Sequence, residues 1–149
     1  MEKKMMKSYV DHGFGFPIRI TNAPMIKVRG AWALNVNHNE LTTAVALTLS
    51  AEKSLLTGNQ LKFIRYFFKM TLKEFGDRFG VAHSTVINWE KKGDHPTKME
   101  WGTEKDIRME VIHHIYKNPE KVGDLFVELS EKPKQASSEL EIDDLKAAS

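Results

Sequence analysis

The sequence of 149 residues contains no cysteine, which excludes disulfide bonds, thiolate zinc sites and cysteine nucleophiles. It also lacks any run of about 18 apolar residues, the length that a membrane-spanning helix requires. Its most apolar stretch, residues 44–49, is far shorter. Residues 1–10 are charged and lack the apolar core of a secretory signal. These absences predict a cytoplasmic protein that makes no membrane contact.

Sequence motifs typical of catalytic or metal-binding sites are absent as well. The six histidines form no i, i+4 pair and no HExxH motif. His113 and His114 are adjacent, so on a helix their side chains point about 100° apart. The glycine-containing segment 13–17 is not followed by a helix, as a phosphate-binding loop would be. We therefore expect no enzyme activity, no metal site and no cofactor.

The charge that is present is unevenly distributed, although the net charge is only +2. Residues 1–56 hold seven basic and four acidic side chains, and residues 57–98 hold eight and four. Residues 99–130 hold four basic and seven acidic side chains, and residues 131–149 hold three and five. The first two-thirds of the chain is thus the part that would attract phosphate.

The hydrophobic pattern predicts a mainly α-helical chain with a small N-terminal β part. Residues 1–8 are expected to be a mobile basic leader. A small domain over 9–56 should contain strands at 18–28, broken at Asn22–Pro24, and at 31–36, with a turn at Arg29–Gly30. A helix over 39–53, capped by Asn37 or Asn39, would complete it. The apolar residues expected to hold this hairpin together are Ile18, Ile20, Ile26, Val28, Trp32, Leu34 and Val36.

From residue 58 the spacing of apolar residues predicts consecutive helices over 58–69, 71–80, 83–92, 103–116 and 119–129. Thr71 and Glu74 have the spacing of a capping box, and Gly80 suits a left-handed helix end. Asn118 is the expected cap of the last helix. These helices define a second domain, 57–130, and the Lys/Glu/Ser/Ala-rich residues 131–149 are expected to be a mobile tail.

Two short helices joined by a three-residue turn occupy the most informative segment, 71–93. Gly76 lies inside the first of them, at a cost of about 1 kcal/mol against alanine, and close approach of the next helix would explain it. The inner contacts are expected from Phe75, Phe79, Val81, Val86 and Trp89. The opposite face of the second helix offers His83, Ser84, Ile87, Asn88 and Lys91, with no acidic residue.

This segment resembles the XRE type of helix-turn-helix, the family of the lambdoid phage repressors and Cro proteins. The resemblance covers residues 58–118 and rests on Leu61 and Arg65, on Lys73-Glu74-Phe75, on Gly80-Val81, and on Ser84-Thr85-Val86 with Trp89-Glu90. It implies a lambda-repressor-like helix-turn-helix bundle. Three positions depart from the family pattern: Leu72 replaces a common glutamine, Gly76 an alanine, and Ala82 a Ser/Thr cap.

The resemblance implies which residues touch double-stranded operator DNA. It assigns base contacts to His83, Ser84, Thr85 and Asn88, and phosphate contacts to Lys73, Lys91, Lys92, and Lys62 or Arg65. Phe75, Gly76, Gly80, Val86 and Trp89 form the structural core of the motif. Arg65 has a structural alternative, which is pairing with Glu74 or Glu90.

The N-terminal half is similar to the MqsA-like antitoxins, in which a small β-hairpin domain precedes an XRE helix-turn-helix. The similarity rests on residues 9–18 and 20–28, but the family's two zinc-binding CxxC pairs are absent. It implies a homodimeric repressor that regulates its own operon and neutralises a cognate toxin protein. Two alternatives stay open: a plain prophage or operon regulator, and a protein-interaction module that sequesters a partner without specific DNA binding. The apolar faces at 103–116 and 119–129 are candidates for the dimer seam, unless they close the monomer core.

Overall fold

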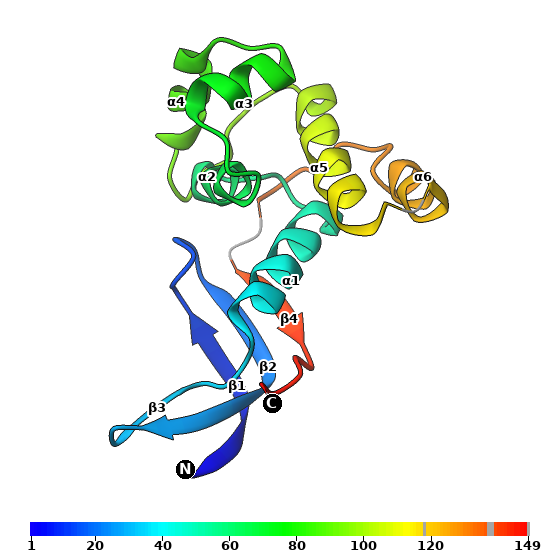
Figure 1. The fold of residues 1–149 in the computed structure, drawn as a ribbon. Coiled ribbons are helices and arrows are strands. Elements are labelled where there is room, and N and C mark those ends of the chain that lie inside the picture. Colours follow the sequence, from blue (N-terminus) through cyan, green and yellow to red (C-terminus); the bar gives the residue numbers. More distant parts are fainter. Residues whose placement is uncertain (118, 137–138, 149) are drawn as a thin grey trace.

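A computed structural model describes residues 1–117, 119–136 and 139–148 of the chain. The described residues form a small four-stranded sheet at one end of the molecule and six helices that extend away from it (Figure 1). In chain order the elements are β1 (Lys3–Asp11), β2 (Ile18–Val28), β3 (Ala31–Leu34), α1 (His38–Ala51), α2 (Gly58–Phe67), α3 (Leu72–Phe79), α4 (His83–Glu90), α5 (Trp101–Tyr116), α6 (Pro119–Glu128) and β4 (Leu140–Asp143).

Strand β2 is the centre of the sheet. β1 pairs with it antiparallel along one edge, from Lys3 opposite Ile26 to Asp11 opposite Ile18. The other edge is divided, because β3 pairs antiparallel with residues 25–28 and β4 pairs parallel with residues 18–21. The predicted turn at Arg29–Gly30 is confirmed: both residues have positive φ, 51° and 81°, as a type I′ hairpin requires.

Three expectations about the β region are wrong. Residues 3–8 are not a mobile leader, because they form most of β1. An edge strand can carry several lysines, since it is held by backbone hydrogen bonds that composition does not reveal. Strand β2 is also not interrupted at residues 22–24, although Asn22 has a positive φ of 50°.

The third correction concerns the C-terminal segment, which is not wholly a mobile tail. Residues 140–143 form β4, in which Leu140 and Ile142 are buried while Glu141 and Asp143 are exposed. The Asn22 side-chain amide donates to the Asp144 carboxylate over 2.8 Å and fixes the end of this strand. The Lys/Glu/Ser-rich composition of this region concealed a short alternating segment whose partner strand lies 122 residues earlier in the chain.

One hydrophobic core joins the sheet to the helices, so the predicted boundary at 56/57 does not separate two cores. Ile18 and Ile20 of β2 are fully buried in the same cluster as Leu61 and Ile64 of α2. Helix α1 packs against both β4 and α5, so it lies between the sheet and α5 (Figure 1). The predicted cap Asn37 is confirmed, since its side chain accepts from the Glu40 amide over 3.1 Å. Val28, expected in the core, is 40% exposed.

A buried arginine fastens α5 to the end of α1. The Arg108 side chain is 0% exposed and donates to the Glu104 carboxylate over 2.9 Å. It also donates to the carbonyl oxygens of Leu49, over 3.0 Å, and Glu52, over 2.6 Å. Glu104 in turn accepts from the Leu56 amide over 3.3 Å. This network satisfies free carbonyl groups where α1 ends and the chain turns toward α2.

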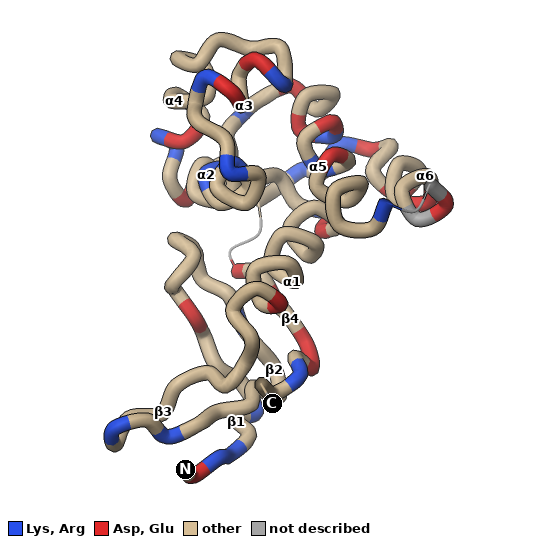
Figure 2. The backbone as a smooth tube through the Cα atoms, in the orientation of Figure 1, with Lys and Arg blue, Asp and Glu red and all other residues tan. Residues whose placement is uncertain are grey.

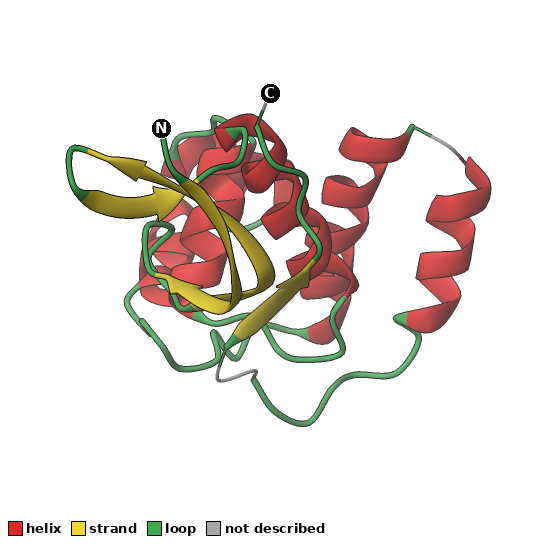
Figure 3. Ribbon diagram, turned by 90° about the horizontal axis from the view of Figure 1, so that it is seen from below, coloured by secondary structure: helices red, strands yellow, loops and turns green. Residues whose placement is uncertain are grey.

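Helices α5 and α6 differ in what their apolar residues do. Ile107, Val111 and Ile112 of α5 are at most 1% exposed, so this helix closes the monomer core. Helix α6 packs on the outside of α5 (Figure 3) and leaves Phe126 and Val127 55% and 69% exposed. The predicted cap Asn118 lies outside the described residues. Within the described part of the chain, none of the helices has the length and apolar character needed to traverse a bilayer.

Candidate nucleic-acid interface

Helices α3 and α4 lie at the end of the molecule that is remote from the sheet (Figure 1). The predicted capping box is confirmed: the Glu74 amide donates to the Thr71 hydroxyl over 3.1 Å, and the Thr71 amide donates to the Glu74 carboxylate over 3.0 Å. Gly80 ends α3 with a left-handed φ of 75°, also as predicted. Helix α4 then begins at His83 with no side-chain cap from Ala82.

Gly76 brings the two helices into backbone contact. A Cβ atom at this position would lie 2.6 Å from the Val81 carbonyl oxygen and 3.3 Å from the His83 nitrogen. The Val81 amide also donates to the Gly76 carbonyl over 2.9 Å. The predicted close approach is therefore confirmed, and an alanine at position 76 would collide with the backbone of the turn.

The inner face of α4 is anchored in the core, as predicted. Val86 is fully buried and Trp89 is 9% exposed, so Trp89 is a packing residue. Phe75 and Phe79 of α3 pack against each other with ring centroids 4.7 Å apart. All four residues belong to the same hydrophobic cluster, so α3 and α4 are held by a common core.

The outer face of α4 is polar and open. His83, Ser84 and Asn88 are exposed, and Thr85 is partly exposed. Lys91 follows at the helix end and is exposed too. The structure thus places the four predicted base-contacting residues on one short helix, with His83, Ser84 and Asn88 at its solvent-facing side and Thr85 at the border of the buried side.

The predicted phosphate-contacting lysines do not all have the same surroundings. Lys62 and Lys91 line a hollow of about 340 Å³ between α2 and α4. Lys92 is exposed directly after α4, whereas Lys73 pairs with Asp77 over 2.8 Å on the surface of α3. Figure 2 shows that basic residues occur on α2, on α3 and beside α4.

Arg65, also predicted to contact phosphate, has the structural role instead. Its Nε donates to the Glu90 carboxylate over 2.7 Å, its Nη1 donates to the Met70 carbonyl over 3.1 Å, and the residue is 8% exposed. The hydrogen bond with Glu90 raises the pKa of the guanidinium further. Because the Arg65 guanidinium is buried and engaged in a bidentate ion pair, we no longer count Arg65 among the residues expected to contact DNA phosphates. It holds α2 to the end of α4.

Sequence reasoning missed Gly58, which makes a second backbone contact beneath α4. A Cβ atom here would lie 2.6 Å from the Trp89 carbonyl and 2.7 Å from the Gly93 nitrogen. The N-terminus of α2 therefore presses directly on the end of α4. Gly58 follows Thr57 in the sequence, but the residues that require a glycine at this position lie more than 30 positions later in the chain.

No group of three or more His, Asp or Glu side chains is placed to hold a metal ion among the residues described in the structure. In comparisons with known proteins, no family model, curated protein or solved structure matches the chain.

Proposed function

We propose that the protein binds double-stranded DNA and presents the outer face of α4 to the major groove. The observation that carries the proposal is the exposed set His83, Ser84 and Asn88 on a helix whose opposite side is locked by Val86 and Trp89. A helix in the major groove needs exposed donors and acceptors on a rigid support. Asn88 is suited to a bidentate pair with adenine.

The charges around α4 support the same proposal. Lys62, Lys91 and Lys92 are exposed, so they are available to phosphates on either side of the groove. The Glu90 carboxylate is half of the pair with Arg65 and is only 11% exposed. It therefore presents little negative charge to a DNA backbone.

We further propose that the protein acts as a homodimer. One short helix reads only a few base pairs, and two-fold symmetry would place a second copy about 34 Å along the duplex. A dimer bound over a promoter would act as a repressor. The antitoxin role needs a toxin partner and rests on the resemblance of the N-terminal half.

A base-reading residue can be separated from a fold-supporting one by Asn88→Ala. A duplex enriched from a randomised DNA library serves as the target, and unenriched duplex as the reference. We expect Asn88→Ala to cost about 1–3 kcal/mol on the enriched duplex and much less on the reference. Asn39→Ala, on the exposed start of α1, is the control and should change neither affinity. Equal losses on both duplexes would remove Asn88 from base recognition.

A phosphate-contacting residue is tested by Lys91→Ala, with Lys146→Ala as a remote exposed control. Loss of one phosphate contact should weaken binding to all sequences and reduce the salt slope by about one unit. An unchanged slope in Lys91→Ala, equal to that of the control, would exclude Lys91 from the phosphate set. Failure of the wild-type chain to bind any duplex would leave the protein-interaction module as the better account.

A further inference from the structure

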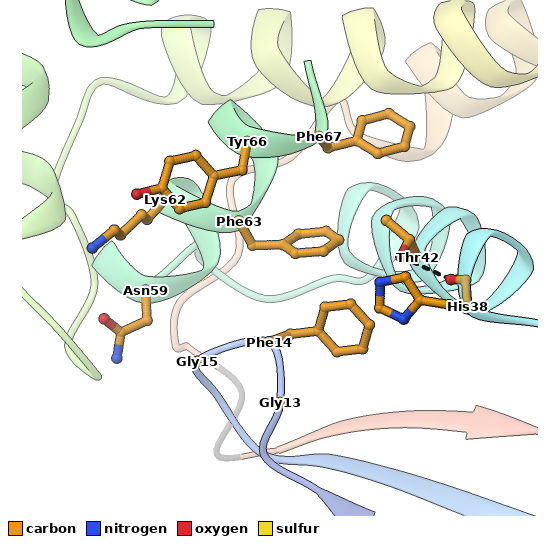
Figure 4. A pocket seen from close by; sticks show the side chains of 10 residues that line it. All are labelled: Gly13, Phe14, Gly15, His38, Thr42, Asn59, Lys62, Phe63, Tyr66 and Phe67. Atoms are coloured by element: carbon orange, nitrogen blue, oxygen red, sulfur yellow. Dashed lines mark hydrogen bonds between the residues drawn. The ribbon is translucent and has the colours of Figure 1, made fainter. Parts of the chain in front are cut away.

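A second hollow lies between the loop that joins β1 to β2, the start of α1, and α2. Its volume is about 470 Å³, and its walls include Phe14, Phe63, Phe67, His38, Thr42 and Lys62. In Figure 4 the rings of Phe14, Phe63 and Phe67 point toward His38 and Thr42 of α1. This size lies within the range of small-molecule sites, about 300–1,000 Å³.

The aromatic walls have a defined geometry. The Phe14 and Phe63 rings meet edge to face, with centroids 5.4 Å apart and an interplanar angle of 87°. Phe14 is parallel to the His38 ring, with centroids 5.9 Å apart and an interplanar angle of 7°. Phe63 is only 7% exposed, so its position is fixed by the core. Such surfaces favour a flat ring that can stack on one wall and meet the edge of another.

Polar residues line both sides of the hollow: the phenylalanine rings point toward His38 and Thr42, and a second polar group lies on the opposite side. Lys62, Asn59 and Tyr66 point away from the three phenylalanine rings in Figure 4. Among the described lining residues Lys62 is the one with a full positive charge, and none is acidic. The Asn59 amide nitrogen donates to Asp94 over 2.9 Å, and that carboxylate is not part of the lining. The hollow thus combines a side walled by phenylalanine rings with an opposite side that carries the Lys62 ammonium.

From this arrangement we propose that the hollow binds a planar aromatic anion of one or two fused rings. The ring system packs among Phe14, Phe63 and Phe67, and the anionic group is held by the Lys62 ammonium on the opposite side of the hollow. The hydroxyl of Thr42 already donates to the His38 carbonyl over 2.9 Å, so it contributes an acceptor and a wall.

The test is calorimetric titration of the full chain with 2-naphthoate and with its neutral isostere 2-naphthamide, without DNA. We expect 2-naphthoate to bind with a Kd below about 1 mM and 2-naphthamide to bind about five- to tenfold more weakly. Lys62→Gln should weaken 2-naphthoate by the same factor and leave 2-naphthamide unchanged. Lys69→Gln, at an exposed position after the same helix and outside the lining, is the control and should alter neither.

A variant that fills the hollow completes the test. Thr42→Phe should abolish binding of both compounds, with circular dichroism showing that the variant remains folded. Absence of 2-naphthoate binding to the wild-type chain at about 1 mM would overturn the proposal. Binding that resists Thr42→Phe would show that the compound sits elsewhere. Binding that is lost in Thr42→Phe but is insensitive to Lys62→Gln would overturn the assignment of an anionic ligand.

The hollow shares Asn59, Lys62 and Tyr66 with the smaller hollow beside α4. A bound anion would therefore occupy the Lys62 ammonium and weaken DNA affinity, a consequence that rests on the proposed function. The ligand titration contains no DNA, so it can succeed or fail independently of DNA binding. If 2-naphthoate binds but leaves the affinity for the enriched duplex unchanged, the coupling between the two sites is wrong.

Discussion

Replacement of Gly76 by alanine sets two well-known effects against each other. Helix propensity alone favours Gly76→Ala by about 1 kcal/mol. The structure predicts that Gly76→Ala lowers the stability of the protein instead. The new Cβ atom would lie 2.6 Å from the Val81 carbonyl oxygen, whereas ordinary contact begins at 3.4 Å. The difference of 0.8 Å must be met by moving backbone, since no flexible side chain is involved.

The size of the effect follows from these contacts. Overpacking typically costs about 1–3 kcal/mol. Moving the turn also strains the 2.9 Å hydrogen bond from the Val81 amide to the Gly76 carbonyl, which is worth about 1 kcal/mol. After the gain in propensity, Gly76→Ala should reduce the free energy of unfolding by about 1–3 kcal/mol.

Gly123→Ala is the matched control, because Gly123 also lies inside a helix but a Cβ atom there would meet nothing within 4 Å. It should stabilise the protein by about 0.5–1 kcal/mol. Urea unfolding followed by circular dichroism measures both variants. If Gly76→Ala is as stable as Gly123→Ala, the close approach of α3 and α4 is wrong, and so is the rigid support proposed for α4.

Two further predictions concern buried and titrating groups. Arg108→Met leaves the Glu104 carboxylate and several carbonyl groups without their partner. It should therefore lower the free energy of unfolding, measured with urea, by about 3–5 kcal/mol. A loss below about 1 kcal/mol would show that the hydrogen-bond network of Arg108 contributes little to stability. The hydrogen bond from the Thr71 backbone amide, followed by that from its hydroxyl, lowers the pKa of Glu74 below 4.5. Because the folded pKa is the lower one, this stabilisation is present above pH 4.5 and is lost as the pH falls through the folded pKa. Thermal unfolding of Glu74→Gln and wild type should therefore differ most at neutral pH and converge in acid, and a constant difference would contradict the role of the carboxylate.

Features set by neighbours in the chain could be predicted from the sequence. The capping box of Thr71 and Glu74 joins positions three residues apart, and the turn at Gly80 depends on that residue's own backbone preference. The outer face of α4 follows from helical spacing alone, which is why His83, Ser84 and Asn88 were found together. These short-range signals also gave the type and approximate limits of the six helices.

Features set by distant partners could not be predicted. β4 is held by β2, and neither its composition nor its position near the end of the sequence indicates that pairing. Arg108 occupies a helix position that periodicity alone cannot distinguish from a surface position, and the four carbonyl groups to which it donates lie more than 50 residues earlier in the chain. The choice of Glu90 over Glu74 for Arg65 likewise depends on how α2 meets α4.

Sequence-specific recognition by α4 is tested by titration of the wild-type chain with DNA from upstream of its own gene and with random duplex, at two salt concentrations. If α4 reads bases, the upstream DNA should contain a site bound at least about 10³-fold more tightly than random duplex. The affinity for both should fall as salt rises, as phosphate contacts require. Equal affinity for upstream and random DNA would contradict sequence-specific recognition by α4.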